Sequence, residues 1–142
     1  MNSRIKYATD VEQSKKLCEF IDVQSSDMYW EVSESRNLLK YKNTPKSDGK
    51  NKCIHAWSLP ALINLLPWEL CQVTDANVDI EDAVCEKYTM RIMCERGDPY
   101  RSYKVLFANR EEAVLFSRIG MTPIDAVYYA ICGLRAEYNW KF

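Results

Sequence analysis

His55 is the only histidine of the chain, and imidazole is well suited to act as a base or as a metal ligand near neutral pH. Cys53 and Ser58 lie close to it in the sequence, so either could serve as a nucleophile that the ring activates. No acid is obviously placed to orient the ring, and the chain has no Cys-x-x-Cys pair of the kind that marks structural zinc sites. We therefore interpret His55 as structural or solvent-facing, and predict no catalytic and no metal-binding residue.

The acidic segment 75–86 is the best match to a calcium-binding loop. Acids or amides stand at its first, third and fifth positions, and Glu86 stands at its twelfth, as in an EF-hand. Its sixth position is Ile80, where the sharp turn of such a loop requires glycine. No amphipathic helix precedes the segment either, because Pro67 ends the helix before it. We therefore predict a solvated acidic connector that binds no metal.

The spacing of the glycines excludes the common phosphate-binding loops. The four glycines are Gly49, Gly97, Gly120 and Gly133, and they stand too far apart to form a nucleotide-binding motif. We therefore predict no cofactor, and the residue patterns favour a non-enzymatic protein over an enzyme.

A basic segment from Arg36 to Lys52 could contact the phosphates of a nucleic acid. It contains one acid, Asp48, and one aromatic residue, Tyr41, whereas single-strand binding sites stack several aromatic side chains. The whole chain has a formal charge of −1, so no general field draws it to DNA or to an anionic membrane. We predict a solvated, flexible loop over about 36–52, with nucleic-acid binding as the alternative. The residues that would make those contacts are Arg36, Lys40, Lys42, Lys46, Lys50 and Lys52.

The C-terminus is strongly aromatic and is the predicted contact site for a protein partner. The last helix devotes its apolar stripe to the core, and the tail beyond it adds further aromatic surface. This tail either folds back over the protein or is offered to a partner or to a second copy of the chain. We favour folding back, because apolar side chains of a monomer are usually buried when they can be. The predicted contact residues are Tyr129, Arg135, Tyr138, Trp140 and Phe142.

Helices and strands are both expected along the chain. Helix-start residues followed by apolar residues at spacings of three and four predict amphipathic helices. A short run of aromatic and β-branched residues predicts a strand over 28–32. The predicted helices cover 10–21 with a capping box of Thr9 and Glu12, 58–66 with Ser58 as cap, 109–119 with Asn109 as cap, and 123–137 with Thr122 as cap.

The strongest pattern is the alternation of apolar and polar residues from 83 to 107, which predicts two antiparallel strands. A two-residue turn at Gly97 and Asp98 would give the glycine a positive φ and would fix the register. That register sets Ile92 opposite Tyr103, Met90 opposite Val105 and Tyr88 opposite Phe107, all on one face.

Length and composition bound the class of protein. With 142 residues, of which 47% are hydrophobic and 27% charged, the chain fits one globular domain over 1–142. The predicted elements indicate an α+β fold, with an antiparallel sheet of three to four strands and helices packed on one face. The sequence shows neither a signal peptide nor an apolar stretch long enough to span a membrane. We therefore expect a cytoplasmic protein that does not bind membranes.

The six cysteines stand singly, and most lie beside apolar residues in periodic segments. A cytoplasmic pool of thiols keeps such residues reduced, and free cysteine packs as a small apolar side chain. We therefore expect no disulfide.

Two motifs carry a resemblance to other proteins. Residues 56–62 read Ala-Trp-Ser-Leu-Pro-Ala-Leu and are followed by Leu-Leu-Pro at 65–67, while Thr-Pro-Ile-Asp-Ala at 122–126 opens the last helix. In this order they resemble a group of short uncharacterised proteins of Bacteroides-type gut bacteria, often carried with prophages or other mobile elements. The tail at 135–140 departs from the more apolar ending of that group. The resemblance implies a mobile-element setting and carries over no catalytic residue.

These observations predict a non-enzymatic binding or accessory protein that acts through a protein partner. The alternative is a nucleic-acid-binding protein that uses the basic segment 36–52. Exposed aromatic side chains beside a polar rim would favour the first function. A steep dependence of binding on salt would favour the second.

Overall fold

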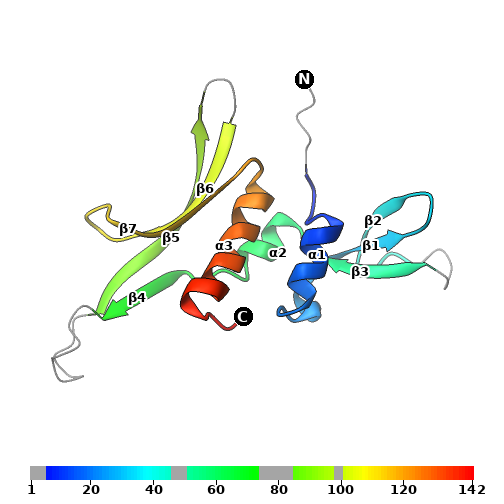
Figure 1. Cartoon of the computed structure of the whole chain (residues 1–142), viewed down its shortest axis with the longest axis horizontal. Coiled ribbons are helices and arrows are strands. Elements are labelled where there is room, and N and C mark those ends of the chain that lie inside the picture. The colour runs from blue at the N-terminus through cyan, green and yellow to red at the C-terminus, as the bar shows by residue number, and fades with distance from the viewer. Residues whose placement is uncertain (1–5, 46–50, 74–84, 98–100) are drawn as a thin grey trace.

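The computed structural model describes residues 6–45, 51–73, 85–97 and 101–142. In these residues two antiparallel sheets lie on opposite sides of a group of three α-helices, as Figure 1 shows. The predicted α+β class with antiparallel strands is therefore confirmed, although the strands form two sheets where one was expected. None of the helices in the described residues is long and apolar enough to cross a membrane.

The small sheet has the strand order β2-β1-β3. Its central strand β1 (Met28–Val32) matches the predicted strand at 28–32. Helix α1 (Val11–Cys18) packs beside β3 (Lys52–Ala56), and the buried Met28 and Ala56 form a small cluster there with Ala8. A short 3-10 helix, η1 (Val23–Ser25), connects α1 to β1.

The prediction of a loop over the whole of 36–52 is wrong, because the segment contributes strand β2 (Asn37–Tyr41) and the first residue of β3. Strand β2 pairs with β1 along its full length, from Asn37 opposite Val32 to Tyr41 opposite Met28. Its lysine and asparagine weaken the local strand signal, whereas pairing with the apolar β1 supplies the backbone hydrogen bonds. Residues 46–50 lie outside the described residues.

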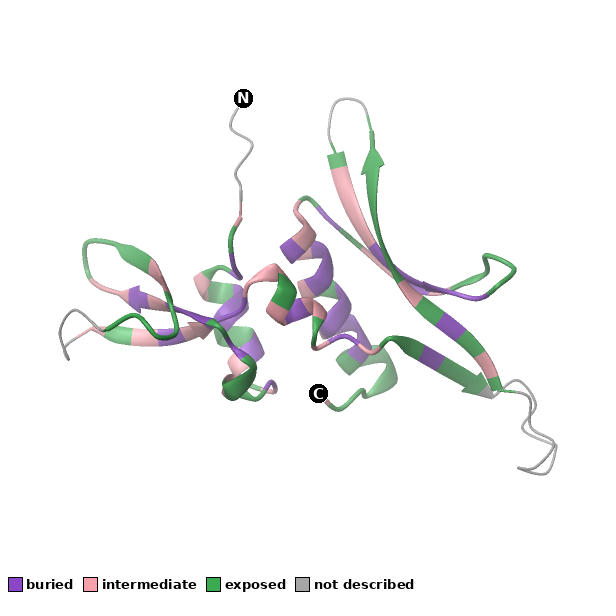
Figure 2. Ribbon diagram, turned by 180° about the vertical axis from the view of Figure 1, so that it is seen from behind, coloured by how far each residue is buried: buried purple, intermediate pink, exposed green. Residues whose placement is uncertain are grey.

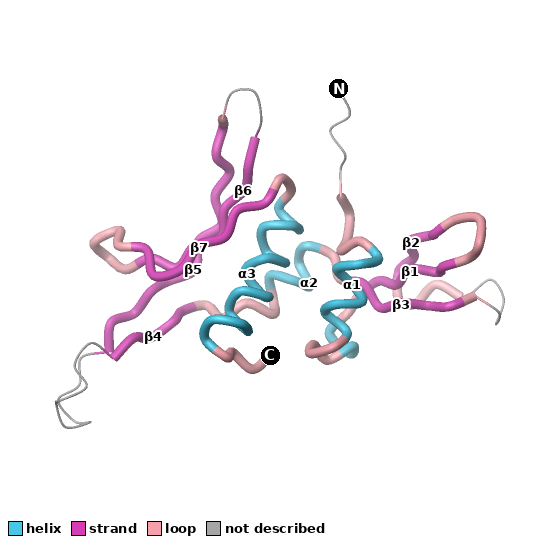
Figure 3. The backbone as a smooth tube through the Cα atoms, viewed as in Figure 1, coloured by secondary structure: helices cyan, strands magenta, loops and turns pink. Residues whose placement is uncertain are grey.

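The large sheet has the order β4-β5-β6-β7, with β4 at Glu69–Val73, β5 at Cys85–Arg96, β6 at Arg101–Ala108 and β7 at Val114–Gly120. Helix α3 (Pro123–Tyr138) packs against β6 and β7, and the short helix α2 (Leu59–Ile63) packs against α3. The face of the large sheet that meets these helices is called its inner face. Figure 3 shows the far ends of β5 and β6 extending past α3.

The predicted hairpin exists, but its register is wrong by two residues. Ile92 lies opposite Val105, not Tyr103, and Arg96 lies opposite Arg101. Four residues, 97–100, therefore connect the strands instead of a two-residue turn, and no described glycine has a positive φ. A shift of two residues keeps every side chain on its predicted face, because side chains alternate with a period of two.

The helix predicted over 109–119 is a turn followed by strand β7. Asn109 starts a turn and not a helix, since its side chain accepts hydrogen bonds from the backbone N–H groups of Glu111 and Ala113 at 3.1 and 2.8 Å. The following chain then pairs with β6, which places Phe116 opposite Phe107 in the core. The apolar residues of this segment fit the spacing of a helix as well as that of a strand, so pairing with β6 decided the outcome.

The other helix boundaries follow their predicted signals closely. Ser58 caps α2 and Thr122 caps α3, each through its side-chain oxygen. The predicted capping box of Thr9 and Glu12 is displaced by one residue, because Asp10 and Gln13 form it. The Thr9 hydroxyl is instead buried between the Ser14 hydroxyl and the backbone of Trp57.

The main core lies between the inner face of the large sheet and the helices, and Figure 2 shows α3 buried along that side. Phe107 and Phe116 meet there with ring centroids 6.2 Å apart. Gly133 allows the close approach of α3 to β7, because a Cβ atom there would stand 2.8 Å from Phe116 Cζ. A residue without a side chain thus lets the helix cross the strand at close range.

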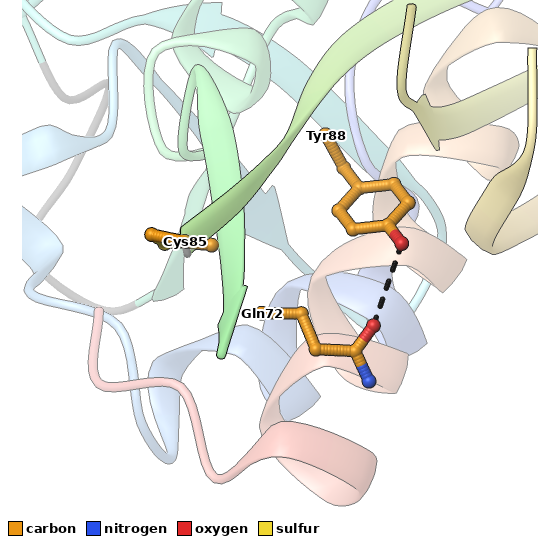
Figure 4. Close-up of a disulfide and its surroundings, with 4 residues drawn as sticks. Gln72, Cys85 and Tyr88 are labelled. Carbon is orange, nitrogen blue, oxygen red and sulfur yellow. Dashed lines mark hydrogen bonds between the residues drawn. A yellow bond between two sulfur atoms is a disulfide. The ribbon is translucent and has the colours of Figure 1, made fainter. Parts of the chain in front are cut away.

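The expectation that no cysteine is bridged is wrong. Cys71 of β4 and Cys85 of β5 form a disulfide, with their Cα atoms 5.8 Å apart. Figure 4 shows this bridge beside the inner-face hydrogen bond of 3.4 Å from Tyr88 Oη to Gln72 Oε1. The pairing of β4 with β5 brings the two cysteines together, and β4 has no strong signal in the sequence. The free cysteines are Cys18, Cys53, Cys94 and Cys132.

Asp125 joins the first turn of α3 to the N-terminal part of the chain. Its Oδ1 accepts hydrogen bonds from Lys6 Nζ at 2.7 Å and from Gln13 Nε2 at 2.8 Å. Burial alone would raise the pKa of Asp125, but the hydrogen bonds from Lys6, Gln13 and Thr122 outweigh it and lower the pKa below its ordinary value. The ionised carboxylate therefore stabilises the folded state.

We expect Asp125→Asn to lower the free energy of unfolding at pH 7 by about 1–2 kcal/mol, the scale of a hydrogen bond to a charged group. Because the folded pKa is lowered, this stabilisation is complete above the unfolded pKa of about 3.9 and is lost as pH falls through the folded pKa. Chemical denaturation from pH 7 to pH 3 should show the difference from the wild type shrinking below about pH 4. Asp10→Asn, which keeps a good cap, is the matched control and should cost less. A gap between Asp125→Asn and the wild type that is unchanged at low pH would contradict this account.

Candidate interaction surface

His55 has a structural environment in the small sheet. Its Nδ1 lies 3.1 Å from the hydroxyl of Ser26, and that hydroxyl donates to the carbonyl oxygen of Val23 at 2.6 Å. The serine proton is therefore directed away from the ring, so the contact fits His55 as donor and Ser26 as acceptor. Ser58, one of the two predicted nucleophiles, donates its hydroxyl hydrogen bond to the carboxylate of Asp27. Cys53, the other predicted nucleophile, directs its thiol to the carbonyl oxygen of Asn51 at 4.0 Å.

The acidic segment 75–86 lies outside the described residues except for its last two positions. Glu86 accepts a hydrogen bond of 2.5 Å from Asn109 Nδ2, which ties β5 to the turn after β6. In the part of the chain that the structure describes, no three side chains of His, Cys, Asp or Glu gather as metal ligands would.

The structure does not bring the predicted nucleic-acid contacts together. Lys40 forms an ion pair of 2.5 Å with Glu31, whose side chain is only 2% exposed. The hydrogen bond to Glu31 raises the pKa of Lys40, so the charged ammonium group is held in an ion pair within the small sheet. Lys52 lies opposite Val32 at one end of that sheet, whereas Lys42 lies beyond the other end. Arg36 is exposed just before β2, and Lys46 and Lys50 lie outside the described residues.

Among the predicted C-terminal contact residues, Arg135, Tyr138 and Phe142 each contact an aromatic ring of the chain. The Arg135 guanidinium lies 4.2 Å from the centroid of the Phe20 ring, and the Phe142 ring lies 6.0 Å from it. Tyr138 meets Phe116 edge to face at 5.9 Å. The tail therefore folds back, as favoured from the sequence. Tyr129, Tyr138 and Trp140 remain partly exposed, at 46%, 42% and 37%.

The outer face of the large sheet, opposite the helices, carries a second apolar cluster that the sequence analysis missed. Val105 and Phe107 belong to the main core, so Leu106 between them points to the outer face. Leu106 is nevertheless only 6% exposed. Its cross-strand partners are Arg91 and Ser117, and the next row outward contains Met93, Lys104 and Ile119.

Three exposed apolar side chains surround Leu106 on this face. Met93 is 45% exposed, Val114 is 51% exposed and Ile119 is 53% exposed. Val114 shares the face because it lies opposite Ala108, two residues along β6 from Leu106. We call Met93, Leu106, Val114 and Ile119 the outer patch. Figure 2 shows that β5 is exposed over most of its length.

Two ion pairs border the outer patch. Arg91 and Glu112 approach to 2.6 Å, and the charge and hydrogen bond of Arg91 lower the pKa of Glu112. Lys104 lies 3.7 Å from Glu95 at the other side. Glu112 has a positive φ of 65°, an uncommon conformation for a residue with a side chain, which directs it towards Arg91. Because Lys104 lies between Met93 and Ile119 in its row, the outer patch combines apolar side chains with two ion pairs that balance in charge.

Strand β7 forms an open edge of the large sheet beside this patch. The N–H of Met90 donates to the carbonyl of Trp68 at 2.9 Å, so even-numbered residues of β5 hydrogen-bond towards β4. Odd-numbered residues of β5 therefore hydrogen-bond to β6, and the same alternation continues from β6 into β7. In β7 it directs the backbone N–H and C=O groups of Ser117 and Ile119 away from β6. Consistent with that direction, the carbonyl of Ser117 accepts a hydrogen bond of 2.8 Å from the Arg118 side chain.

Comparisons of the chain with models of protein families, with curated proteins and with solved structures give no match. The functional argument therefore stands on the surface geometry of this chain.

Proposed function

We propose that this chain is a non-enzymatic binding protein that acts through a protein partner, and that the partner binds the outer patch. The observation that carries the proposal is the exposure of Met93, Val114 and Ile119 around the buried Leu106, on the face opposite the helices. Covering apolar surface stabilises a complex by about 25 cal/mol for each Å² removed from water. Apolar side chains that lie together on a surface commonly mark a protein interaction site.

The rim of the outer patch favours a protein over a nucleic acid as the partner. Its two ion pairs, Arg91 with Glu112 and Lys104 with Glu95, balance in charge, whereas a phosphate backbone selects an excess of positive charge. Apolar side chains together with charge-balanced polar groups are usual in a protein–protein interface. The ion pair of Lys40 with the buried Glu31 further weakens the alternative of nucleic-acid binding.

The cytoplasmic location and the mobile-element setting belong to the same proposal and derive from the sequence. In the cytoplasm glutathione reduces most disulfides, so Cys71 and Cys85 should there be found as thiols for much of the time. Rapid alkylation of intact cells followed by mass spectrometry would detect this state, and a fully oxidised pair would contradict the proposed location.

Site-specific photo-cross-linking tests the proposed function. A photoreactive residue at position 119 should form discrete adducts with a protein in cells that produce this chain, because Ile119 is 53% exposed in the outer patch. The same residue at position 38 is the matched control, since Leu38 is an apolar residue, 37% exposed, on the edge of the small sheet. We expect adducts at 119 and none at 38.

A second substitution separates binding from chance proximity. Met93→Glu places a charge in the outer patch at a side chain that is already 45% exposed, so the melting temperature should change little. The adduct at position 119 should then be lost. Equal adducts at both positions, no adduct at 119, or adducts that survive Met93→Glu would each overturn the proposal.

A further inference from the structure

We infer that the partner at the β7 edge is a second copy of this chain, joined by antiparallel pairing of two β7 strands about a two-fold axis at Ser117. The inference rests on the proposed function and names its partner at this edge. It follows from the backbone direction, the charges and the symmetry of β7.

The backbone of β7 is ready to accept another strand. Ser117 and Ile119 direct their N–H and C=O groups to the open edge, as the hydrogen-bond alternation from Met90 requires. The carbonyl of Ser117 already accepts from Arg118, but a carbonyl oxygen has two lone pairs and can accept a second hydrogen bond. An antiparallel second β7 would offer donors and acceptors in the matching alternation.

The edges of the described sheets differ in charge. The edge strands β2 and β3 of the small sheet carry Lys40 and Lys52, and β4 carries Glu69. Such charges are a common protection against pairing between edges. The charged residue of β7 is Arg118, which stacks on Phe116 at 4.3 Å and pairs with Glu137 of α3. The outer-facing residues of β7, Ser117 and Ile119, are uncharged, so the outer side of this edge lacks such protection.

Symmetry makes β7 complementary to itself. An axis at Ser117 sets Ile119 of each copy opposite Leu115 of the other, the residue next to Val114, so the two outer patches meet across the interface. The same antiparallel pairing brings the Glu112 end of one strand towards the Lys104 end of the other, twice in the dimer. Both charges are already held in ion pairs within each copy, so the two ends do not repel each other, and the isologous contact closes on itself.

Sedimentation velocity on the full chain tests the inference. From about 1 μM to about 500 μM, the wild type should pass from monomer to dimer. Ile119→Lys should raise the dissociation constant of the dimer at least about tenfold, because it places a charge where the two outer patches meet. Leu38→Lys puts the same charge on a small-sheet edge and should leave the dissociation constant unchanged. Circular dichroism of both variants shows whether they remain folded.

Disulfide trapping tests the register without weakening the interface. In a hydrogen-bonded antiparallel pair the Cα atoms lie about 5.5 Å apart, so Ser117→Cys should cross-link two copies across the axis under mild oxidation. Ser102→Cys on β6 and the wild type, which already carries four free cysteines, are the controls and should stay uncrosslinked.

The outcomes distinguish the two proposals. A wild type that stays monomeric throughout, a dimer that survives Ile119→Lys, or cross-linking at Ser102→Cys equal to that at Ser117→Cys overturns the β7 dimer. If the chain is monomeric while position 119 still cross-links to a different protein in cells, the inference fails and the proposed function stands. If neither a dimer nor an adduct forms, both fail.

Discussion

Trp57→Ala is expected to lower the free energy of unfolding by about 3–5 kcal/mol, the range for truncating a fully buried large aromatic residue. Trp57 is fully buried between β3 and α2 and belongs to the main core. Its backbone carbonyl accepts from the N–H of Thr9 at 2.9 Å, and its indole N–H donates to the hydroxyl of Ser25 at 2.9 Å. Truncation would leave a cavity where three parts of the chain meet. Equilibrium denaturation measures the loss.

Trp68→Ala is the matched control, because Trp68 is 76% exposed and leaves no comparable cavity. We expect its effect to stay within about 0.5 kcal/mol, as for most surface substitutions. Equal losses for the two tryptophans would contradict the position assigned to the core.

Gly120→Ala is expected to cost about 3 kcal/mol, towards the upper end of the range for overpacked positions. A Cβ atom at Gly120 would stand 2.8 Å from the carbonyl carbon of Asp125 and 2.9 Å from the Cα of Ala126. Both neighbours are backbone atoms in the first turn of α3, so β7 and the helix would have to separate. The melting temperature and the denaturation midpoint should both fall.

Gly133→Ala provides the comparison for this substitution. Its Cβ would meet the end of the Phe116 ring and the Arg118 guanidinium, which are side chains that can move. Alanine also gains about 1 kcal/mol of helix propensity over glycine. We therefore expect a clearly smaller loss than at Gly120, and the reverse order would show that β7 and α3 approach each other differently.

Local signals predicted the elements whose boundaries are set by a cap or by composition. Strand β1 was predicted over its whole length, and α2 and α3 begin at the predicted caps Ser58 and Thr122. Strands β4 and β3 were missed and β7 was taken for a helix, because each is defined by its partner strand more than by its own residues. The hairpin register failed because the paired strands end at Arg96 and Arg101, which leaves four residues between them and not two.

The candidate surface was not predictable from the sequence for related reasons. Ile119 ends the helix predicted over 109–119, whereas pairing with β6 places it on the outer face, in one row with Lys104 and Met93. The alternation in β5 did predict two faces, but not which of them the helices leave uncovered. The C-terminal tail was predicted as a contact site because it is rich in aromatic residues, whereas in the structure Phe142 packs against Phe20 of the same chain.

Hydroxyl-radical footprinting tests the central claim most directly, because it needs no substitution. Labelling of Met93 and Ile119 should be several-fold weaker in cells than in dilute purified protein, whereas Trp68 and Tyr41, at 76% and 68% exposure, should be labelled alike in both. The two controls lie outside the outer patch and correct for differences in radical dose. Protection of Met93 and Ile119 alone is the result that the account predicts. Unchanged labelling of Met93 and Ile119, or equal protection of all four residues, would contradict it.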